Sequence, residues 1–152
     1  MDGMNIVVVF PGQGSQSIGM LSDYAETWPQ IQETFQQASD ALGYDCWDIV
    51  CNGPEDKINM TEITQPIMLA ADIAVMRVMA QQCMLEPMVF AGHSLGEYAA
   101  LVAARSIDFV DAIKLVARRG QLMQEAVPEG EGAMAAILGL DAEVVGRLCR
   151  EQ

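Results

Sequence analysis

The pentapeptide Gly92-His93-Ser94-Leu95-Gly96 holds the residues that could do chemistry. Its Gly-x-Ser-x-Gly spacing is typical of a nucleophile elbow, in which a serine stands on a strained turn between a strand and a helix. Side chains two residues before and after the serine would collide, so Gly92 and Gly96 are needed there. The helix that follows points its first backbone amides at the reacting centre, where an oxyanion forms. The pattern predicts Ser94 as a catalytic nucleophile, and the alternative is a serine in a structural turn.

The base that such a serine needs is not evident in the sequence. A serine nucleophile is activated by a base, usually histidine, that a third group orients. The single histidine is His93. Adjacent residues on a sharp turn point apart, so we interpret His93 as a structural residue that braces the elbow. In enzymes with this elbow the base follows the serine along the chain, so either a missing segment supplies it or the site is incomplete.

The glycine-rich loop after the first apolar run does not fit a nucleotide site. The dinucleotide pattern that Gly12 and Gly14 could begin fails because Ser17 stands at the third glycine. In the phosphate-loop pattern, Met20 and Leu21 replace the required Lys and Ser or Thr. A loop of this type can instead donate backbone amides to the site, and the alternative is a plain turn.

Four basic residues gather after the elbow: Arg105, Lys114, Arg118 and Arg119. They are half of the 8 basic residues of an acidic chain. For most of them a solvated helix face is the simpler interpretation. One arginine that faced Ser94 would bind a substrate carboxylate in bidentate fashion. A hydrolase of neutral esters has no such need.

Apolar patterning predicts the elements that would position these residues. Two short apolar runs, 6–10 and 88–91, lack alternation, which favours strands buried on both faces of a parallel sheet. Between 22 and 42, apolar side chains recur every three or four positions, which predicts one helix. Further helices are expected over 65–84, with Pro66 in the first turn, and over 97–105, 109–125 and 141–148. A strand is expected over 133–138, a loop-rich stretch over 45–64 and a linker at 128–132. This order indicates an α/β fold with a parallel sheet.

Composition argues against several classes of function. Lys and Arg total 8 against 21 Asp and Glu, a net charge of −13. Nucleic-acid and anionic-membrane binding both need a positive field, so neither is expected. The 4 cysteines form no C-x-x-C pair and 1 histidine accompanies them, so no metal site is expected. We recognise neither a signal peptide nor an apolar stretch of roughly 18 residues, and we expect a cytoplasmic protein with reduced thiols.

Four blocks of the sequence carry a resemblance to a known family. They are Phe10-Pro11-Gly12-Gln13-Gly14-Ser15-Gln16, Gly92 to Tyr98, Arg119-Gly120 and Gly132 to Ile137. Their order and spacing closely resemble the malonyl-CoA:acyl carrier protein transacylases of bacterial fatty-acid synthesis. The resemblance covers essentially the whole chain, but about the N-terminal half of the family. It implies transfer of a malonyl group from coenzyme A to the phosphopantetheine thiol of acyl carrier protein, in a ping-pong reaction.

The resemblance also implies a role for each matching residue. Ser94 would carry malonyl as an ester, and the backbone amides of Gln13 and Leu95 would form the oxyanion hole. Arg119 would hold the free malonyl carboxylate. The residues expected to line the pocket or brace the elbow are His93 and Gln65. No metal or redox cofactor would be required, since the coenzyme A thioester is itself the substrate.

The fold that the resemblance implies is an α/β-hydrolase-like parallel-sheet core with an inserted ferredoxin-like subdomain. Residues 1–130 would be a partial acyltransferase core, and residues 131–152 the first strand and helix of the insert. The family's catalytic histidine and the residue that orients it lie in the half that this chain lacks. The chain therefore looks truncated or split, and the missing half is an expected partner as a second chain. Alone, the chain is not expected to turn over at full rate.

Three alternatives stay open. A polyketide synthase acyltransferase domain shares the elbow, although the start at Met1 favours a free-standing enzyme. A serine esterase needs only the elbow, and both Arg119 and the loop around Gln13 argue against it. A non-catalytic fragment that binds a partner chain would account for the single histidine.

Overall fold

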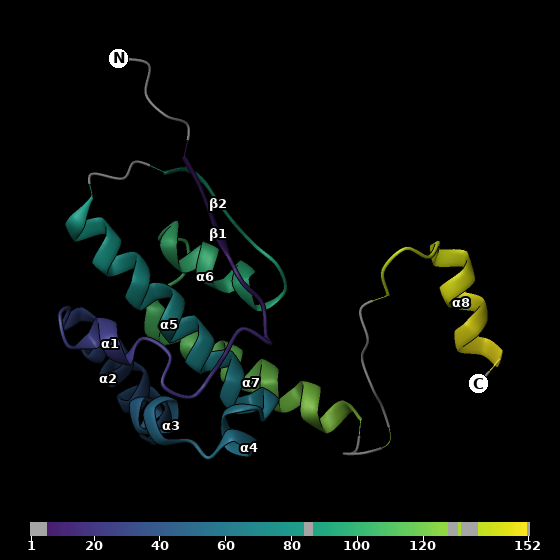
Figure 1. The fold of residues 1–152 in the computed structure, drawn as a ribbon, viewed down its shortest axis with the longest axis horizontal. Helices are drawn as coiled ribbons and strands as arrows, with labels where there is room; N and C mark the ends of the chain where they lie inside the picture. Colours follow the sequence, from purple (N-terminus) through teal and green to yellow (C-terminus); the bar gives the residue numbers. More distant parts are fainter. Residues whose placement is uncertain (1–5, 84–86, 128–130, 132–136, 152) are drawn as a thin grey trace.

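The computed structural model describes residues 6–83, 87–127, 131 and 137–151. Within them the chain is a mixed α/β structure with a small parallel sheet, as the sequence predicts (Figure 1). The elements are β1 (Ile6–Phe10), α1 (Ser22–Ala25), α2 (Gln30–Leu42), α3 (Cys46–Asn52), α4 (Glu55–Ile58), α5 (Thr61–Gln82), β2 (Pro87–Gly92), α6 (Leu95–Ala103), α7 (Phe109–Ala126) and α8 (Ala142–Glu151).

The two strands bring distant parts of the chain together at one end of the sheet. β1 and β2 pair in parallel, and the register places Phe10 opposite Gly92 at their carboxyl ends. The connection between them contains α1 to α5, as a parallel pair requires a long crossover. The loop that follows β1 and the turn that follows β2 therefore leave the sheet at the same edge. Ligand sites of open parallel sheets form at this edge.

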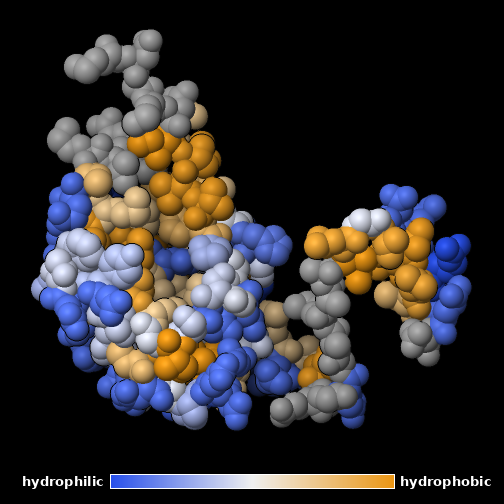
Figure 2. Space-filling model, in the orientation of Figure 1, coloured by the Kyte–Doolittle hydropathy of each residue, from blue (hydrophilic) through white to orange (hydrophobic). Residues whose placement is uncertain are grey.

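One face of the sheet is exposed, which corrects the prediction of burial on both faces. α6 packs against β1 and β2 on one side, where Phe10 is buried. On the other side apolar side chains face outward, and Val9 is 69% exposed. Figure 2 shows an apolar patch over these strands. The exposed apolar side chains of the strands are Val7, Val9, Met88 and Val89. The sequence pattern is that of a doubly covered strand, but the described part of the chain supplies only one cover.

α5 is the central helix of the body. It packs against α2, α6 and α7, and most of its residues in the first three turns are buried. By length and composition α5 could cross a membrane, but 56% of its most apolar stretch is buried inside the protein. Such burial is typical of a core helix, which is apolar all round because it is covered on several sides.

The start of α5 differs from the prediction. The helix begins at Thr61, so Pro66 lies inside it and not in its first turn. Proline removes one backbone hydrogen bond there. The Thr64 hydroxyl supports this turn, because Oγ1 donates to the backbone oxygens of Ile58 at 2.6 Å and Met60 at 3.0 Å.

Two predictions between residues 22 and 64 are wrong. The helix expected over 22–42 is divided into α1 and α2, and Pro29 stands at the start of α2. Proline lacks an N–H and favours the first position of a helix, so it separates the two elements. The stretch 45–64, expected to be loop-rich, holds α3, α4 and the first turn of α5. Asp45 caps α3 by accepting from the backbone N–H of Asp48 at 2.8 Å.

The helices after β2 follow the prediction closely. α6 begins at Leu95, directly after the elbow, and α7 begins at Phe109 as expected. Asp108 caps α7, since its carboxylate accepts from Val110 N–H at 2.8 Å. Both helices therefore start where a local signal, a turn or a capping residue, permits them to start.

The C-terminal segment is described only in part. α8 runs from Ala142 to Glu151, where the sequence predicts a helix, and it buries none of its residues (Figure 1). The expected strand over 133–138 lies mostly outside the described residues, and Ile137 and Leu138 are not in a strand. The linker at 128–132 also lies outside them, apart from residue 131. The division into residues 1–130 and 131–152 stays a prediction.

Asp72 on α5 is a carboxyl group that the fold buries without compensation. Its Oδ2 is buried and has no hydrogen-bond partner in the part of the chain that the structure describes. Burial raises the pKa of Asp72 to about 7. The folded state therefore favours the protonated form, whereas an unfolded chain releases the proton near pH 4. Stability should fall as the pH rises between these two values and stay reduced above about pH 7.

We expect Asp72→Asn to raise the free energy of unfolding by roughly 1–3 kcal/mol at pH 8, and by less at pH 5. Asparagine stays neutral at every pH, so it removes the cost of a buried charge. Urea denaturation of both proteins at the two pH values measures the effect. Asp40→Asn, at an exposed position of α2, is the control and should change stability little. An equal gain at both pH values would contradict the assignment.

Candidate active site

Ser94 occupies the strand–turn–helix position that its motif requires. It follows β2 and stands directly before α6, with φ 54° and ψ −108°. This positive φ is strained for a residue with a side chain. The turn is closed by the Gly96 N–H, which donates to the His93 carbonyl at 2.9 Å. The Ser94 side chain is exposed at the tip of this turn, where a substrate can reach it.

The two glycines of the elbow are required because backbones approach closely there. A Cβ on Gly92 would overlap the backbone of Gly96 and lie 2.6 Å from the Glu97 nitrogen. A Cβ on Gly96 would overlap the Phe10 carbonyl and lie 2.7 Å from the Pro11 oxygen. The sheet, the turn and α6 are thus pressed together at this point. No residue with a side chain fits without moving the backbone.

Arg119 reaches the nucleophile from the neighbouring helix. One terminal nitrogen of its guanidinium donates to Ser94 Oγ at 2.9 Å. The other donates to Gln65 Oε1 at 2.8 Å. The guanidinium carbon also lies 5.7 Å from the centre of the Tyr98 ring. The family resemblance points to Arg119, and the structure places its guanidinium beside Ser94.

Gly120 explains how Arg119 comes so close. A Cβ at this position would lie 2.8 Å from the Thr61 carbonyl oxygen and 2.6 Å from the Glu62 Cα. α7 therefore passes against the start of α5 at a distance that only glycine allows. This contact brings Arg119, on α7, beside Gln65 on α5.

Gln65 is a fully buried polar residue whose orientation is set by its partners. Its side chain is 0% exposed. The amide Nε2 donates to Met123 Sδ at 3.2 Å, and the amide oxygen accepts from Arg119. A buried amide needs hydrogen-bond partners, and these two satisfy Gln65. Its oxygen therefore faces the guanidinium.

The loop after β1 lies beside the elbow. A Cβ on Gly12 would be 3.2 Å from the His93 carbonyl oxygen, so the two backbones are near neighbours. Gln13 is tied to α5, since its Nε2 donates to Thr61 Oγ1 at 3.3 Å. The loop is further held where Gln16 Nε2 donates to Asn59 Oδ1 at 2.8 Å. The oxyanion-hole role of the Gln13 and Leu95 amides stays a prediction.

His93 lies next to this loop. Its side chain is exposed, and its Nδ1 lies 3.6 Å from where a Cβ on Gly12 would stand. The described residues show a hydrogen bond from Arg119 to the Ser94 hydroxyl, and none from His93. The position suits the predicted bracing role and not proton transfer from Ser94.

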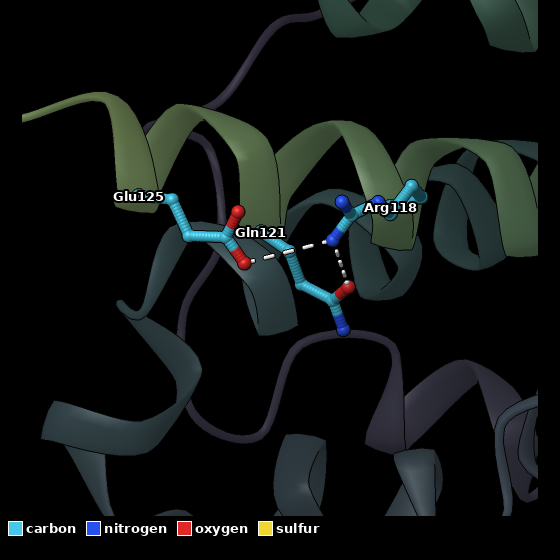
Figure 3. A network of polar contacts seen from close by, with 3 residues as sticks. All are labelled: Arg118, Gln121 and Glu125. Atoms are coloured by element: carbon cyan, nitrogen blue, oxygen red, sulfur yellow. Dashed lines mark hydrogen bonds and ion pairs between the residues drawn. The ribbon is translucent and has the colours of Figure 1, made fainter.

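The other basic residues of the predicted cluster do not contact Ser94. Arg118 points to solvent, where it donates to Gln121 Oε1 at 3.2 Å and lies 3.6 Å from Glu125 Oε1 (Figure 3). Lys114 is exposed on the same helix. Arg105 lines a separate hollow of about 590 Å³ at the other end of α6. The solvated interpretation therefore holds for Lys114 and Arg118.

The cysteines and acidic residues do not form an alternative centre among the described residues. No group of three metal-ligating side chains occurs in this part of the chain. The four cysteines are free, and burial raises the pKa of the Cys46 thiol to about 11. A thiol with so high a pKa is a poor nucleophile at neutral pH. The absence of a metal requirement stays a prediction.

Two residues of the site were missed by the sequence analysis. Tyr98 follows Ser94 by four positions on α6, and Met123 follows Arg119 by four positions on α7. Residues spaced by four share one face of a helix. This spacing was a usable signal, but the partner that each side chain meets lies on another helix.

A comparison with protein families agrees with this geometry. Residues 7–151 match the family model described as the acyl transferase domain. The chain belongs to this family. The match covers the elbow, Gln65 and Arg119.

Curated relatives of this chain include malonyl CoA-acyl carrier protein transacylases. The chain is 58% identical over 145 residues to the malonyl CoA-acyl carrier protein transacylase of Haemophilus influenzae, covering 95% of this chain and 46% of the relative. It is 56% identical over 143 residues to that of Escherichia coli strain K12, covering 94% and 46%. The chain thus spans about half the length of the curated relatives it matches.

Solved structures show the same relation. An acyl carrier protein S-malonyltransferase from Vibrio cholerae superposes with a TM-score of 0.88 at 54% identity, over 95% of this chain and 47% of that one. A malonyl-transacylase solved in complex with a type II polyketide synthase acyl-carrier protein gives a TM-score of 0.91 at 55% identity, over 97% and 48%. The described elements therefore follow the backbone of these acyltransferases.

We expect Gly92→Ala to destabilise the chain by roughly 2 kcal/mol or more and to abolish labelling of Ser94 by a fluorophosphonate, a neutral serine-directed probe. The added methyl group would overlap the Gly96 backbone and displace the turn. Urea denaturation and mass spectrometry of the labelled chain measure the two effects. Gly146→Ala, where a Cβ meets only the Arg150 guanidinium at 3.6 Å, is the control. Unchanged stability in Gly92→Ala would contradict the steric account.

Proposed function

We propose that this chain is the nucleophile-bearing half of a malonyl-CoA:acyl carrier protein transacylase of fatty-acid synthesis. The observation that carries the proposal is the 2.9 Å contact between the Arg119 guanidinium and Ser94 Oγ. A malonyl group esterified to Ser94 ends in a carboxylate, which one methylene group separates from the ester carbonyl carbon. A guanidinium beside the serine binds such a carboxylate with two parallel hydrogen bonds. A neutral acyl group has no carboxylate that the guanidinium could bind.

The proposed reaction runs in two steps on Ser94. The serine oxygen attacks the malonyl thioester, the oxyanion is stabilised by the amides of Gln13 and Leu95, and coenzyme A leaves. The phosphopantetheine thiol of acyl carrier protein then attacks the malonyl-serine ester and restores the serine. The reaction requires no metal or redox cofactor, and the cytoplasm is its proposed location. One solved relative is held in complex with an acyl-carrier protein, which supports the choice of acceptor.

We also propose a partner that completes the site. The described residues supply a nucleophile and a carboxylate anchor. The sequence holds 1 histidine, His93, and the structure shows no hydrogen bond between it and the Ser94 hydroxyl among the described residues. β1 and β2 expose apolar side chains on one face, and the chain spans about half of its relatives. A C-terminal half would supply the base and cover that face. The complete fold would then be an α/β-hydrolase-like core, with residues 131–152 opening a ferredoxin-like insert.

The alternatives are weakened by the same contacts. A serine esterase for neutral esters gains nothing from an arginine bound to its nucleophile. A fragment that only binds a partner needs no ordered set of Ser94, Gln65 and Arg119. A polyketide synthase acyltransferase would use the same geometry, and one of the solved relatives is in complex with a type II polyketide synthase acyl-carrier protein.

Reassembly is the direct test of the partner. We expect the chain alone to transfer malonyl from malonyl-CoA to acyl carrier protein slowly or not at all. Addition of the separately produced C-terminal half of the Haemophilus influenzae relative should raise the rate by on the order of 10⁴- to 10⁶-fold, since the loss of a triad member lowers serine catalysis by that amount. Ser94→Ala in the same mixture is the control. Full-rate transfer by the chain alone would contradict the split arrangement.

Selectivity tests the substrate. In the reassembled protein, Arg119→Ala should lower malonyl loading of Ser94 by about ten- to a hundredfold, because a charge-assisted hydrogen-bond pair is lost. Acetyl loading, which uses no carboxylate contact, should not fall in parallel. Intact-protein mass spectrometry counts both adducts. Equal losses for the two acyl groups would contradict the assignment of Arg119.

A further inference from the structure

The Arg119 guanidinium is held by neutral groups only. Its two hydrogen-bond partners are Gln65 Oε1 and Ser94 Oγ, and its third contact is the face of the Tyr98 ring. In the described part of the chain, the ion pair within 4.0 Å joins Arg118 to Glu125, on the solvent side of α7. Among the described residues of this chain of net charge −13, Arg119 thus forms no ion pair with a carboxylate within 4.0 Å. Its full charge remains for a substrate.

One of these three contacts cannot last through the reaction. When Ser94 becomes an ester, its oxygen bonds to the acyl carbon and is a poorer hydrogen-bond acceptor. The nitrogen that donates to Ser94 Oγ in this structure is then released toward the acyl group's own oxygens. At that stage the long arginine side chain is positioned by Gln65 and by Tyr98 alone.

We propose that Tyr98 is a positioning residue that makes the site selective for carboxylated acyl groups. This proposal rests on the proposed function of Arg119. The aromatic face attracts the guanidinium by its quadrupole, and the 5.7 Å separation lies within the range of such contacts. Because the ring is uncharged, it holds the cation without neutralising it, as an aspartate or glutamate would do.

The placement of Tyr98 fits this role. It lies on α6, which begins directly after Ser94, so the serine and the aromatic ring adjoin the same helix. Gln65 approaches from α5, where Met123 Sδ accepts from its amide at 3.2 Å. The guanidinium is therefore held from two sides by two helices, in the orientation that presents it to Ser94.

Binding to a chain that cannot be acylated tests the proposal. In a Ser94→Ala background, the affinities for malonyl-CoA and acetyl-CoA are measured by calorimetry. Tyr98→Leu should lower the preference for malonyl-CoA by about two- to fivefold, the size expected of an exposed cation–π contact. Tyr98→Phe keeps the ring and should retain the preference, and acetyl-CoA affinity should not change. Tyr24→Leu, at an exposed tyrosine stacked on Trp28, is the matched control.

The outcomes separate the two claims. A wild-type preference for malonyl-CoA that persists in Tyr98→Leu overturns the role of Tyr98 and leaves the proposed function intact. Equal affinities for both thioesters in the otherwise unaltered chain contradict the proposed function itself. The contact has its own readout, because a ring beneath the guanidinium shifts the NMR signals of the Arg119 side-chain protons. That shift should vanish in Tyr98→Leu and persist in Tyr98→Phe, and a spectrum unchanged by Tyr98→Leu overturns the contact.

Discussion

The close approach of three backbone segments at the elbow is the constraint on which the site depends. The turn around Ser94 is pressed between the end of β1 and the start of α6, with glycine at both points of contact. The strained backbone conformation of Ser94 persists because the sheet and the helix hold the turn from both sides. The same crowding sets the loop around Gln13 against the elbow. The close backbone contacts at the elbow therefore position both Ser94 and the expected oxyanion donors.

A second close backbone contact, between α7 and the start of α5, places the positive charge of Arg119 in the site. Gly120 lets α7 touch the start of α5, and this contact carries Arg119 to the nucleophile. The fully buried Gln65 and the Tyr98 ring then hold the cation without neutralising it. The chain is acidic overall, so most of its surface repels anions. The Arg119 guanidinium beside Ser94, which forms no ion pair among the described residues, is a local positive charge that attracts them.

The described structure contains the proposed nucleophile, Ser94, and the proposed carboxylate-binding residue, Arg119. It does not contain a complete acyltransferase core. The exposed face of β1 and β2 carries the apolar side chains of a covered sheet. Both the curated relatives and the solved structures extend over about twice the length of this chain. In the proposed function, both the cover and the base come from the second half that those relatives contain. In this interpretation the apolar surface of the strands is an assembly surface.

The sequence by itself determined the features that depend on local patterns. The elbow, α7 and α8 were all predictable, because glycine spacing, an Asp cap and helical periodicity act within a few residues. The residue pattern left open which arginine meets Ser94, and the family resemblance pointed to Arg119. The tertiary structure placed Arg119 beside Ser94 and brought Gln65, Met123 and Tyr98 around it. It also decided that one sheet face is bare. These outcomes depend on helices that meet across long separations in sequence, and no local pattern specifies which side chains will face each other there.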